Sequence, residues 1–193
     1  MGIIKTALEI ALERTESVKS DKSSIDQFEA KQRGKKLANA FLAGEADMAS
    51  EIKKTVPAQM ESLKQGIFDV LVSQIALPDG AGEEKRIELI GKGLQMVIKD
   101  GNFPVMYKQL VQLFAQYLQE AAQYDQAIRQ QYAPKLRQKE EELSRRMGRE
   151  VRIDPMQDPE FAAFYAQHMN ALKSNYEEMI GQAKAEARRM FES

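Results

Sequence analysis

The sequence predicts an all-α protein, in which a compact helical N-terminal region packs on the base of a long antiparallel helical hairpin. The chain is rich in Ala, Glu, Lys, Gln, Leu and Arg, residue types that favour helix over strand. No segment alternates apolar and polar residues as a half-buried strand would. Apolar residues recur instead at spacings of three and four, which is typical of helices with one buried face.

The first predicted helix covers Ile3 to about Val18, with apolar residues on one face and charged residues on the other. The polar run from Lys19 to Ser24 is expected to end it. Ser24, with a glutamine three residues later, forms a capping box that would start a second helix. We expect this second helix to end near Gly44, because glycine commonly terminates helices.

The third predicted helix begins near Asp47 or Ser50, either of which could cap it. Pro57 then marks a kink or a fresh start, since proline is tolerated only in the first turn of a helix. The helical pattern ends at Leu77. The residues that follow, Pro-Asp-Gly-Ala-Gly, are typical of a turn.

A fourth helix is predicted over 83–99, where Gly91 and Gly93 would allow close approach of a neighbouring helix. We place a domain boundary after it, between an N-terminal helical region of about four helices (1–102) and a long hairpin (103–193). Nine of the eleven glycines lie in the first region and all six tyrosines in the second. The two regions could still form one continuous domain.

The second region opens with a long predicted helix that carries Pro104 in its first turn. Its apolar residues follow the spacing of a coiled-coil seam: Met106, Leu110, Leu113, Tyr117, Ala121, Tyr124, Ile128 and Tyr132. Pro134 would kink or split this helix, because proline removes a backbone hydrogen bond and crowds the preceding turn. Ten of the sixteen residues from 135 to 150 are charged, which predicts a solvent-exposed tip.

The last helix is expected to start with Asp158 as its cap and Pro159 in its first position. Folding the chain back about a centre near Asp154 matches apolar residues across the two long helices. The expected pairs are Met147 with Phe161, Leu143 with Tyr165, Leu136 with Leu172, Tyr132 with Tyr176, Ile128 with Ile180 and Leu118 with Met190.

Residue types that carry chemistry are scarce, and we assign no catalytic, cofactor-binding or metal-ligating residue. The chain has no cysteine and one histidine, His168, which lies beside an apolar stripe and is expected to be a partly buried packing residue. Adjacent carboxylates occur at 83–84, 140–142 and 177–178. On a helix they point about 100° apart, so they do not converge on one substrate.

Two kinds of segment could bind anions, and neither pattern is complete. The glycines at 79–82 precede a helix, but no strand comes before them, no Gly-Lys-Ser/Thr follows, and two glutamates occupy the place of a phosphate. An interhelical turn is therefore expected there. Basic clusters at 31–36, 145–149 and 188–189 are small, and acidic residues flank the middle one.

Charge and hydropathy exclude several classes of protein. With 28 basic and 29 acidic residues the formal net charge is −1, so no overall field favours nucleic acid or an anionic membrane. The N-terminus does not have the form of a secretory signal, and the longest apolar run is interrupted by polar residues. Without cysteines, disulfides and thiol catalysis are excluded. We therefore expect a cytoplasmic protein.

The opening residues ALEIALERTESVKSDK (7–22), followed by GKKLA (34–38), resemble a bacterial family of uncharacterised proteins, a domain of unknown function. The resemblance extends through the C-terminal hairpin. It implies a bacterial cytoplasm, and no activity, cofactor or site residue carries over from it.

The leading hypothesis is a non-enzymatic helical interaction or scaffolding protein that binds protein, either itself or another chain. Two helices cannot bury their seam and the flanking Tyr107, Val111, Phe114 and Leu118 without a third surface, from the N-terminal helices or another subunit. One alternative is a ligand-binding bundle or enzyme with a pocket lined by Met, Tyr and Phe. The other is peripheral association with membrane or nucleic acid.

Overall fold

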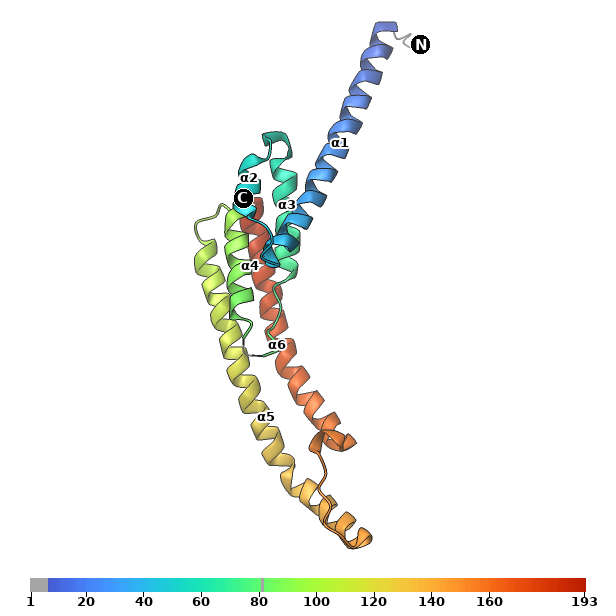
Figure 1. Cartoon of the computed structure of the whole chain (residues 1–193), viewed down its shortest axis with the longest axis vertical. Helices are drawn as coiled ribbons and strands as arrows, with labels where there is room; N and C mark the ends of the chain where they lie inside the picture. The colour runs from blue at the N-terminus through green and yellow to red at the C-terminus, as the bar shows by residue number, and fades with distance from the viewer. Residues whose placement is uncertain (1–6, 81) are drawn as a thin grey trace, which may run out of the picture. The chain divides into compact units, whose positions relative to one another are not determined.

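The computed structural model describes residues 7–80 and 82–193, with side chains from Ser23 onward (Figure 1). The expected start of the first helix, at Ile3, lies outside these residues. The described residues are helical and contain no strand, which confirms the all-α class. The helices are α1 (Ala7–Leu42), α2 (Met48–Lys54), α3 (Pro57–Ser73), α4 (Glu84–Val97), α5 (Phe103–Met147), the short 3₁₀ helix η1 (Pro155–Gln157) and α6 (Pro159–Glu192).

The chain divides into two compact units. Unit 1 comprises the chain up to Ile75 together with 85–103 and 189–193, and therefore contains α1 to α4. Unit 2 comprises 76–84 and 104–188, which is most of α5 and α6.

Helix α1 is continuous where the sequence suggested two helices, so the expected break at 19–24 was wrong. Lys, Ser and Asp each cost less than about 0.7 kcal/mol in a helix relative to Ala, too little to end one without glycine or proline. The expected end was right. Gly44 has φ +76°, its N–H donates to Phe41 at 3.0 Å, and the N–H of Glu45 donates to Ala40 at 2.8 Å, a Schellman motif.

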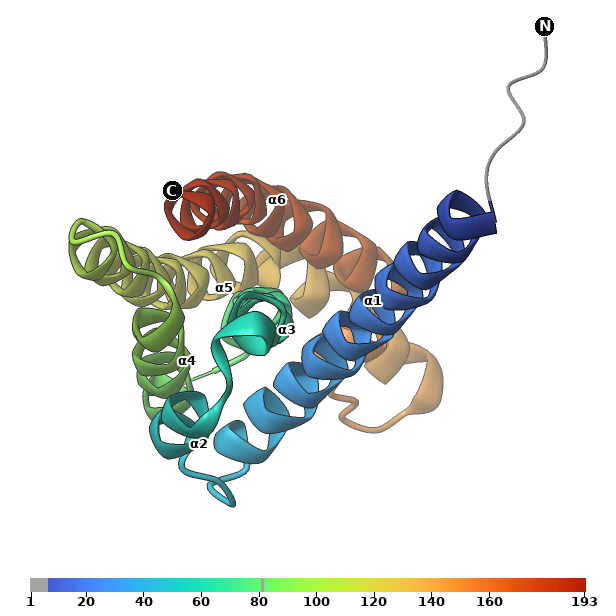
Figure 2. The same ribbon diagram turned by 90° about the horizontal axis from the view of Figure 1, so that it is seen from above.

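Helices α1 and α3 cross where each contributes a glycine, and Figure 2 shows the crossing from above. A Cβ added at Gly34 would lie 2.1 Å from the carbonyl oxygen of Leu63. A Cβ added at Gly66 would lie 2.1 Å from the carbonyl oxygen of Lys31. Buried alanines flank Gly34 four residues away on either side. The two backbones can therefore meet only because these positions lack side chains.

Helices α2 and α3 begin where the sequence indicated. Asp47 caps α2 by accepting from the N–H of Ser50 at 3.3 Å, and Pro57 starts α3 afresh and does not kink a longer helix. Helix α3 ends at Ser73, four residues before the expected end. Gly93 gives the close approach expected of it, because a Cβ there would lie 2.7 Å from Leu71 Cδ1.

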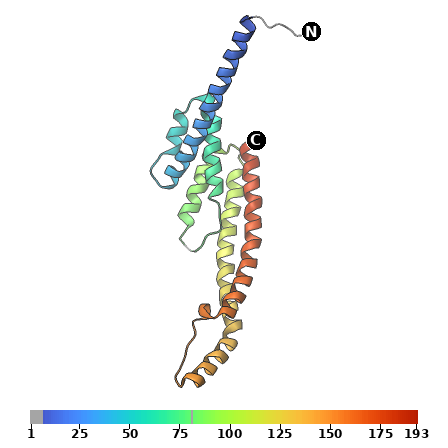
Figure 3. The same ribbon diagram turned by 90° about the vertical axis from the view of Figure 1, so that its right-hand side faces the viewer.

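Helices α5 and α6 form the expected long antiparallel hairpin (Figure 3). Helix α5 continues through Pro134 as one element, so proline does not split it. Helix α6 begins at Pro159, and the Asp158 carboxylate accepts from the N–H of Glu160 at 3.0 Å, as expected of its cap.

The register of the hairpin differs from the expected one by fifteen residues along α5. Tyr176 contacts Tyr117 and not Tyr132, and Phe161 contacts Tyr132 and not Met147, with ring centroids 5.2 Å apart in both pairs. The expected pairing treated the connector as a symmetrical turn. In the structure the connector runs back beside the last turns of α5 before α6 begins, and this displaces both pairs.

Candidate functional site

The hairpin tip, which we define as residues 135–160, is held together by bonds from its connector to α5. The N–H of Val151 donates to Ser144 Oγ at 2.9 Å. The N–H of Ile153 donates to Glu140 Oε1, also at 2.9 Å. Both acceptors lie on α5, so Val151 and Ile153 of the connector are both bonded to that helix. The tip therefore has a defined shape.

A partly buried ion pair joins α5 to the start of α6 within the tip. Lys139 Nζ lies 2.6 and 2.9 Å from the carboxylate oxygens of Asp158, and 2.5 Å from Glu160 Oε2. Tyr132 donates its hydroxyl to Asp158 at 3.3 Å, and Lys135 pairs with Glu160 at 3.0 Å. Asp158 is only 5% exposed, and a carboxylate buried to that degree requires compensating partners. Lys139 therefore closes the network that caps α6.

These partners shift the pKa values of the network toward its charged state. Hydrogen bonding to Lys139 lowers the pKa of Asp158 below its ordinary 3.8 and that of Glu160 below 4.5. Hydrogen bonds to Asp158 and then Glu160 raise the pKa of Lys139 above 10.5. The lowered carboxyl pKa values stabilise the tip at neutral pH, and this stabilisation is lost as pH falls through the folded-state values.

We expect the Asp158 carboxyl to titrate below 3.8 in the folded protein, as followed by the pH dependence of its side-chain NMR signal. The variant Lys139→Met should move that midpoint upward, because the ammonium that favours the carboxylate is gone. Lys173→Met serves as the control, since Lys173 and Glu177 are exposed side chains of α6 and are 3.9 Å apart. A wild-type midpoint at or above 3.8 would contradict the pairing.

An aromatic cluster supports the tip along the hairpin. Ile128, Tyr132 and Phe161 are buried, and four partly buried residues pack against them. Arg129 lies 5.9 Å from the ring centres of both Phe161 and Tyr165, and it holds Asp125 at 2.9 and 3.0 Å. The edge-to-face and tilted ring contacts and the guanidinium together fix the direction in which α6 leaves the tip.

Further along the hairpin, the pKa of Tyr176 is raised to about 12. Burial is the larger cause, and a hydrogen bond with Glu120 is the smaller one. The folded state thus favours the neutral phenol, so the stabilisation is present below pH 10 and is lost as pH rises toward 12. We expect the tyrosinate absorbance at 295 nm to differ between wild type and Tyr176→Phe only near pH 12. A difference that develops near pH 10 in folded protein would contradict this environment.

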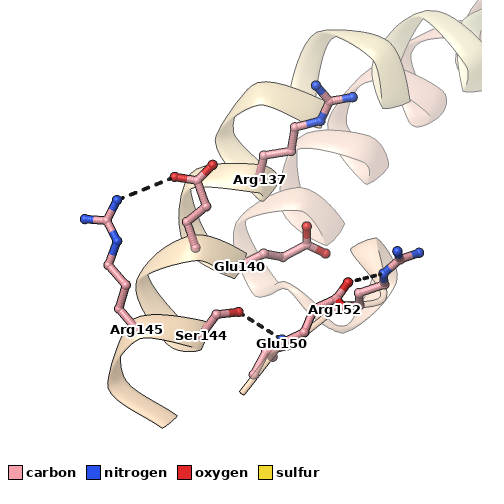
Figure 4. Close-up of a pocket in the computed structure, with 8 residues that line it drawn as sticks. Arg137, Glu140, Ser144, Arg145, Glu150 and Arg152 are labelled. Carbon is pink, nitrogen blue, oxygen red and sulfur yellow. Dashed lines mark hydrogen bonds and ion pairs between the residues drawn. The ribbon is translucent and has the colours of Figure 1, made fainter. Parts of the chain in front are cut away.

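Two open pockets lie at the tip. The larger, of about 570 Å³, is bordered by α5 and the returning connector, and three arginines line it: Arg137, Arg145 and Arg152 (Figure 4). The smaller, of about 370 Å³, is lined by residues that include Arg146 and Glu142. Six of the eight residues that line the larger pocket and four of the eight that line the smaller one are charged. Neither lining includes Tyr117, Tyr124, His168 or Tyr176. They are thus unlike the Met, Tyr and Phe pocket of the ligand-binding alternative.

The tip has seven basic and seven acidic residues, so its charges balance, but not all of them are paired within it. Glu141 pairs with Arg145 at 3.9 Å and Glu150 with Arg152 at 3.2 Å, while Glu140 and Asp154 accept from the connector. Among the described residues of the tip, three arginines and one glutamate have neither a hydrogen bond nor an ion pair through their side chains. They are Arg137, Arg146, Arg149 and Glu142.

The residues singled out from the sequence have structural roles wherever their contacts are described. His168 is half-buried, and its ring centroid lies 4.5 Å from that of Phe164 in an edge-to-face arrangement, as expected of a packing residue. In the turn after Leu77, the N–H of Asp79 donates to Glu83 Oε1 at 3.0 Å, so this amide is already bonded to a carboxylate of the chain. In residues 23–80 and 82–193, no group of three or more His, Asp or Glu could hold a metal ion.

The sequence indicated that Asp158 caps α6, but it did not indicate that Lys139 is the ion-pair partner of Asp158. The Asp-Pro pair at 158–159 was a visible capping signal. Lys139, nineteen residues earlier, carried no signal, because its proximity to Asp158 depends on the path of the connector. The basic cluster at 145–149 was recognised, while Arg137 and Arg152 were not.

The chain belongs to a family of unknown function, DUF6657, which matches residues 49–189 of the 193. The match begins in α2 and runs almost to the end of α6, so it includes the hairpin and its tip. It leaves out the N-terminal residues on which the resemblance was first noted. No curated protein and no solved structure matches the chain. None of the described helices is long and apolar enough to cross a membrane.

Proposed function

We propose that this member of the DUF6657 family is a non-enzymatic interaction protein of the bacterial cytoplasm, which binds protein partners through its hairpin tip. The observation that carries this proposal is the bracing of the tip. A partly buried ion pair and two hydrogen bonds from backbone N–H groups to side chains fix a short charged segment that has little apolar surface of its own. Ordering a segment costs about 1–2 kcal/mol per residue, and a preorganised surface avoids this cost on binding.

The chain's contacts fit a binding surface better than an active site. The best-placed acid and base, Asp158 and Lys139, neutralise each other, and Asp158 also caps α6. Neither group is left to transfer a proton to a substrate, and the pockets beside them are open. Scaffolding by the tip, in contrast, requires only fixed shape and charge.

Affinity capture with the full chain tests this proposal. Lys139→Gln combined with Glu140→Gln removes the bonds that hold Asp158 and Ile153, and should release the tip without disturbing the hairpin stem. Lys173→Gln combined with Glu177→Gln is the matched control, because it makes the same two charge changes at an exposed pair.

We expect wild type and the control to capture the same protein in a fixed ratio from a lysate of the source bacterium, and the tip variant to lose it. Purified components should reproduce the complex in solution. Equal capture by all three chains, or no stoichiometric partner of wild type, would contradict the proposal. Circular dichroism of the tip variant checks that the helices are retained.

Self-association is a second part of the proposal. Exposed apolar residues on α1 support it, whereas the sequence had suggested the hairpin stem. Tyr107 and Phe114 are already 8% and 3% exposed within a single chain, so the stem does not require another subunit. Ile25 and Phe28, three residues apart on α1, are 58% and 63% exposed. Sedimentation at micromolar concentration should show a dimer that Ile25→Ser with Phe28→Ser converts to monomer. A monomeric wild type would refute this part.

A further inference from the structure

The exposed pair Ile25 and Phe28 lies on the side of α1 that faces away from α3. Gly34 is the residue at which α1 meets the backbone of α3. Successive residues of a helix are about 100° apart, so Gly34, nine residues after Ile25, lies half a turn away from it. The contact with α3 therefore leaves this side of α1 open to a partner.

These two residues alone are too few for a stable interface, which usually takes about 20–30 residues from each partner. Helix α1 passes through 7–22 before it reaches the pair. In Figure 1 this part of the helix runs past the end of α3, which belongs to the same unit. The N-terminal part of α1 is therefore the surface that can extend the exposed pair.

The sequence of this part has the periodicity of a coiled coil. Spacings of three and four residues alternate through positions 8, 11, 15, 18, 22 and 25, which gives three heptads from 8 to 28. Four of these six seam positions are apolar, and two are polar: Leu8, Ala11, Val18 and Ile25, then Thr15 and Lys22. A helix with such a seam is suited to pairing with a second helix of the same kind.

Lys22 distinguishes the two ways in which two copies of this seam can pair. In a parallel pair each seam residue lies opposite itself, so two Lys22 ammonium groups would meet in the interface. In an antiparallel pair centred between positions 16 and 17, Lys22 lies opposite the small Ala11 of the other copy. The lysine stem can cover Ala11 while its ammonium reaches water at the edge. The same pairing places Ile25 opposite Leu8.

The charges that flank the seam make the same distinction. Arg14 and Asp21 are the last residues of the first two heptads, and Lys19 and Asp26 follow seam positions on the other flank. A parallel pair would place Arg14 beside Lys19, and Asp21 beside Asp26, which are like charges. An antiparallel pair places Arg14 beside Asp21 of the other copy, and the two-fold axis repeats this contact. Flanking charges of this kind set the orientation of a coiled coil.

We propose that α1 pairs with α1 of a second copy of this chain, in an antiparallel coiled coil over 8–28 in which Arg14 of each copy binds Asp21 of the other. The inference rests on the self-association proposed above, and it adds the surface and the orientation. A contact that uses the same surface of both copies closes as a two-fold dimer and does not grow into a filament.

Distances between spin labels in the full chain test the orientation. The chain has no cysteine, so Ser24→Cys or Lys36→Cys gives one labelling site per copy, and both positions are exposed. With a rise of about 1.5 Å per residue, the antiparallel pair separates the two labels along the helix axis by about 23 Å in Ser24→Cys and by about 58 Å in Lys36→Cys. A parallel pair would keep the labels close together in both variants.

Charge reversal, followed by sedimentation equilibrium, tests the pairing of Arg14 with Asp21. We expect Arg14→Glu to raise the dissociation constant of the dimer about tenfold, because the altered pair occurs twice and each attraction becomes a repulsion. Combining Arg14→Glu with Asp21→Arg should restore the wild-type constant. Glu13→Arg is the matched control, since it reverses a charge at a position of the heptad that lies away from the seam.

The contrary results separate the inference from the proposed function. A dimer that tightens in Arg14→Glu, with short label distances at both sites, would be parallel, because Arg14 would then face Lys19. A dimer that responds equally to Arg14→Glu and Glu13→Arg would show that 8–28 is not the interface. Either result would overturn the antiparallel coiled coil and leave self-association standing. A monomeric wild type would refute self-association itself.

Discussion

Replacing Gly34 by alanine is expected to lower the free energy of unfolding by about 3 kcal/mol, the upper end of the usual cost of overpacking, because the neighbouring atoms are rigid. The new Cβ would lie 2.1 Å from the carbonyl oxygen of Leu63 and 3.1 Å from the N of Ile67. These are backbone atoms, so no side chain can rotate away to relieve the clash. Helices α1 and α3 would have to separate along their whole contact.

Urea unfolding followed by circular dichroism measures this loss, and the chain supplies its own control. Gly181 lies within α6, and a Cβ there would meet nothing within 4 Å. Gly181→Ala should therefore stabilise the helix by about 0.5–1 kcal/mol, because glycine is the more flexible residue in the unfolded chain. Gly66→Ala should resemble Gly34→Ala. If Gly34→Ala behaves like Gly181→Ala, the close crossing of α1 and α3 is incorrect.

Replacing Phe161 by alanine is expected to cost about 3–5 kcal/mol, the usual range for a fully buried phenylalanine. Phe161 is 1% exposed, and its ring contacts Tyr132 and Tyr165 at centroid distances of 5.2 and 5.7 Å. The cavity would remove the partner of Tyr132 at the point where α6 begins. The effect should appear in near-ultraviolet circular dichroism, which reports these tyrosines.

The register supplies the contrast for this second prediction. In the structure, Phe161 is a central residue of the cluster and Met147 is 53% exposed. Met147→Ala should therefore change stability by less than about 0.5 kcal/mol, as surface substitutions usually do. In the register expected from the sequence these two residues were partners and would lose similar amounts. Comparable losses of stability in Phe161→Ala and Met147→Ala would instead support the register expected from the sequence.

The sequence was most reliable where a feature depends on local chemistry. Gly44 ends a helix because of its own backbone angle, and Asp47 and Asp158 begin helices because their side chains accept nearby N–H groups. Pro159 and Pro104 lie in first turns for equally local reasons. The continuity of α1 shows the reverse case, since a polar run without glycine or proline does not break a helix.

The register could not be obtained from the sequence, because a long apolar stripe matches its partner at several offsets. The connector selects the offset. Its backbone bonds to Ser144 and Glu140 of α5, so several residues run back along that helix before α6 starts. The same path brings Lys139 to Asp158. The candidate site was therefore predictable as a charged tip with a capped helix, and not as a braced network.

Amide hydrogen exchange at Val151 and Ile153, resolved by NMR at neutral pH, tests most directly the claim that the tip is a preorganised surface. Each N–H is bonded to a side chain of α5 at 2.9 Å. We expect both amides to exchange at least about tenfold more slowly than in an unstructured chain, because each must open before it exchanges. In Lys139→Gln with Glu140→Gln this protection should be lost. Wild-type amides that exchange at the unstructured rate would show that the tip is not braced.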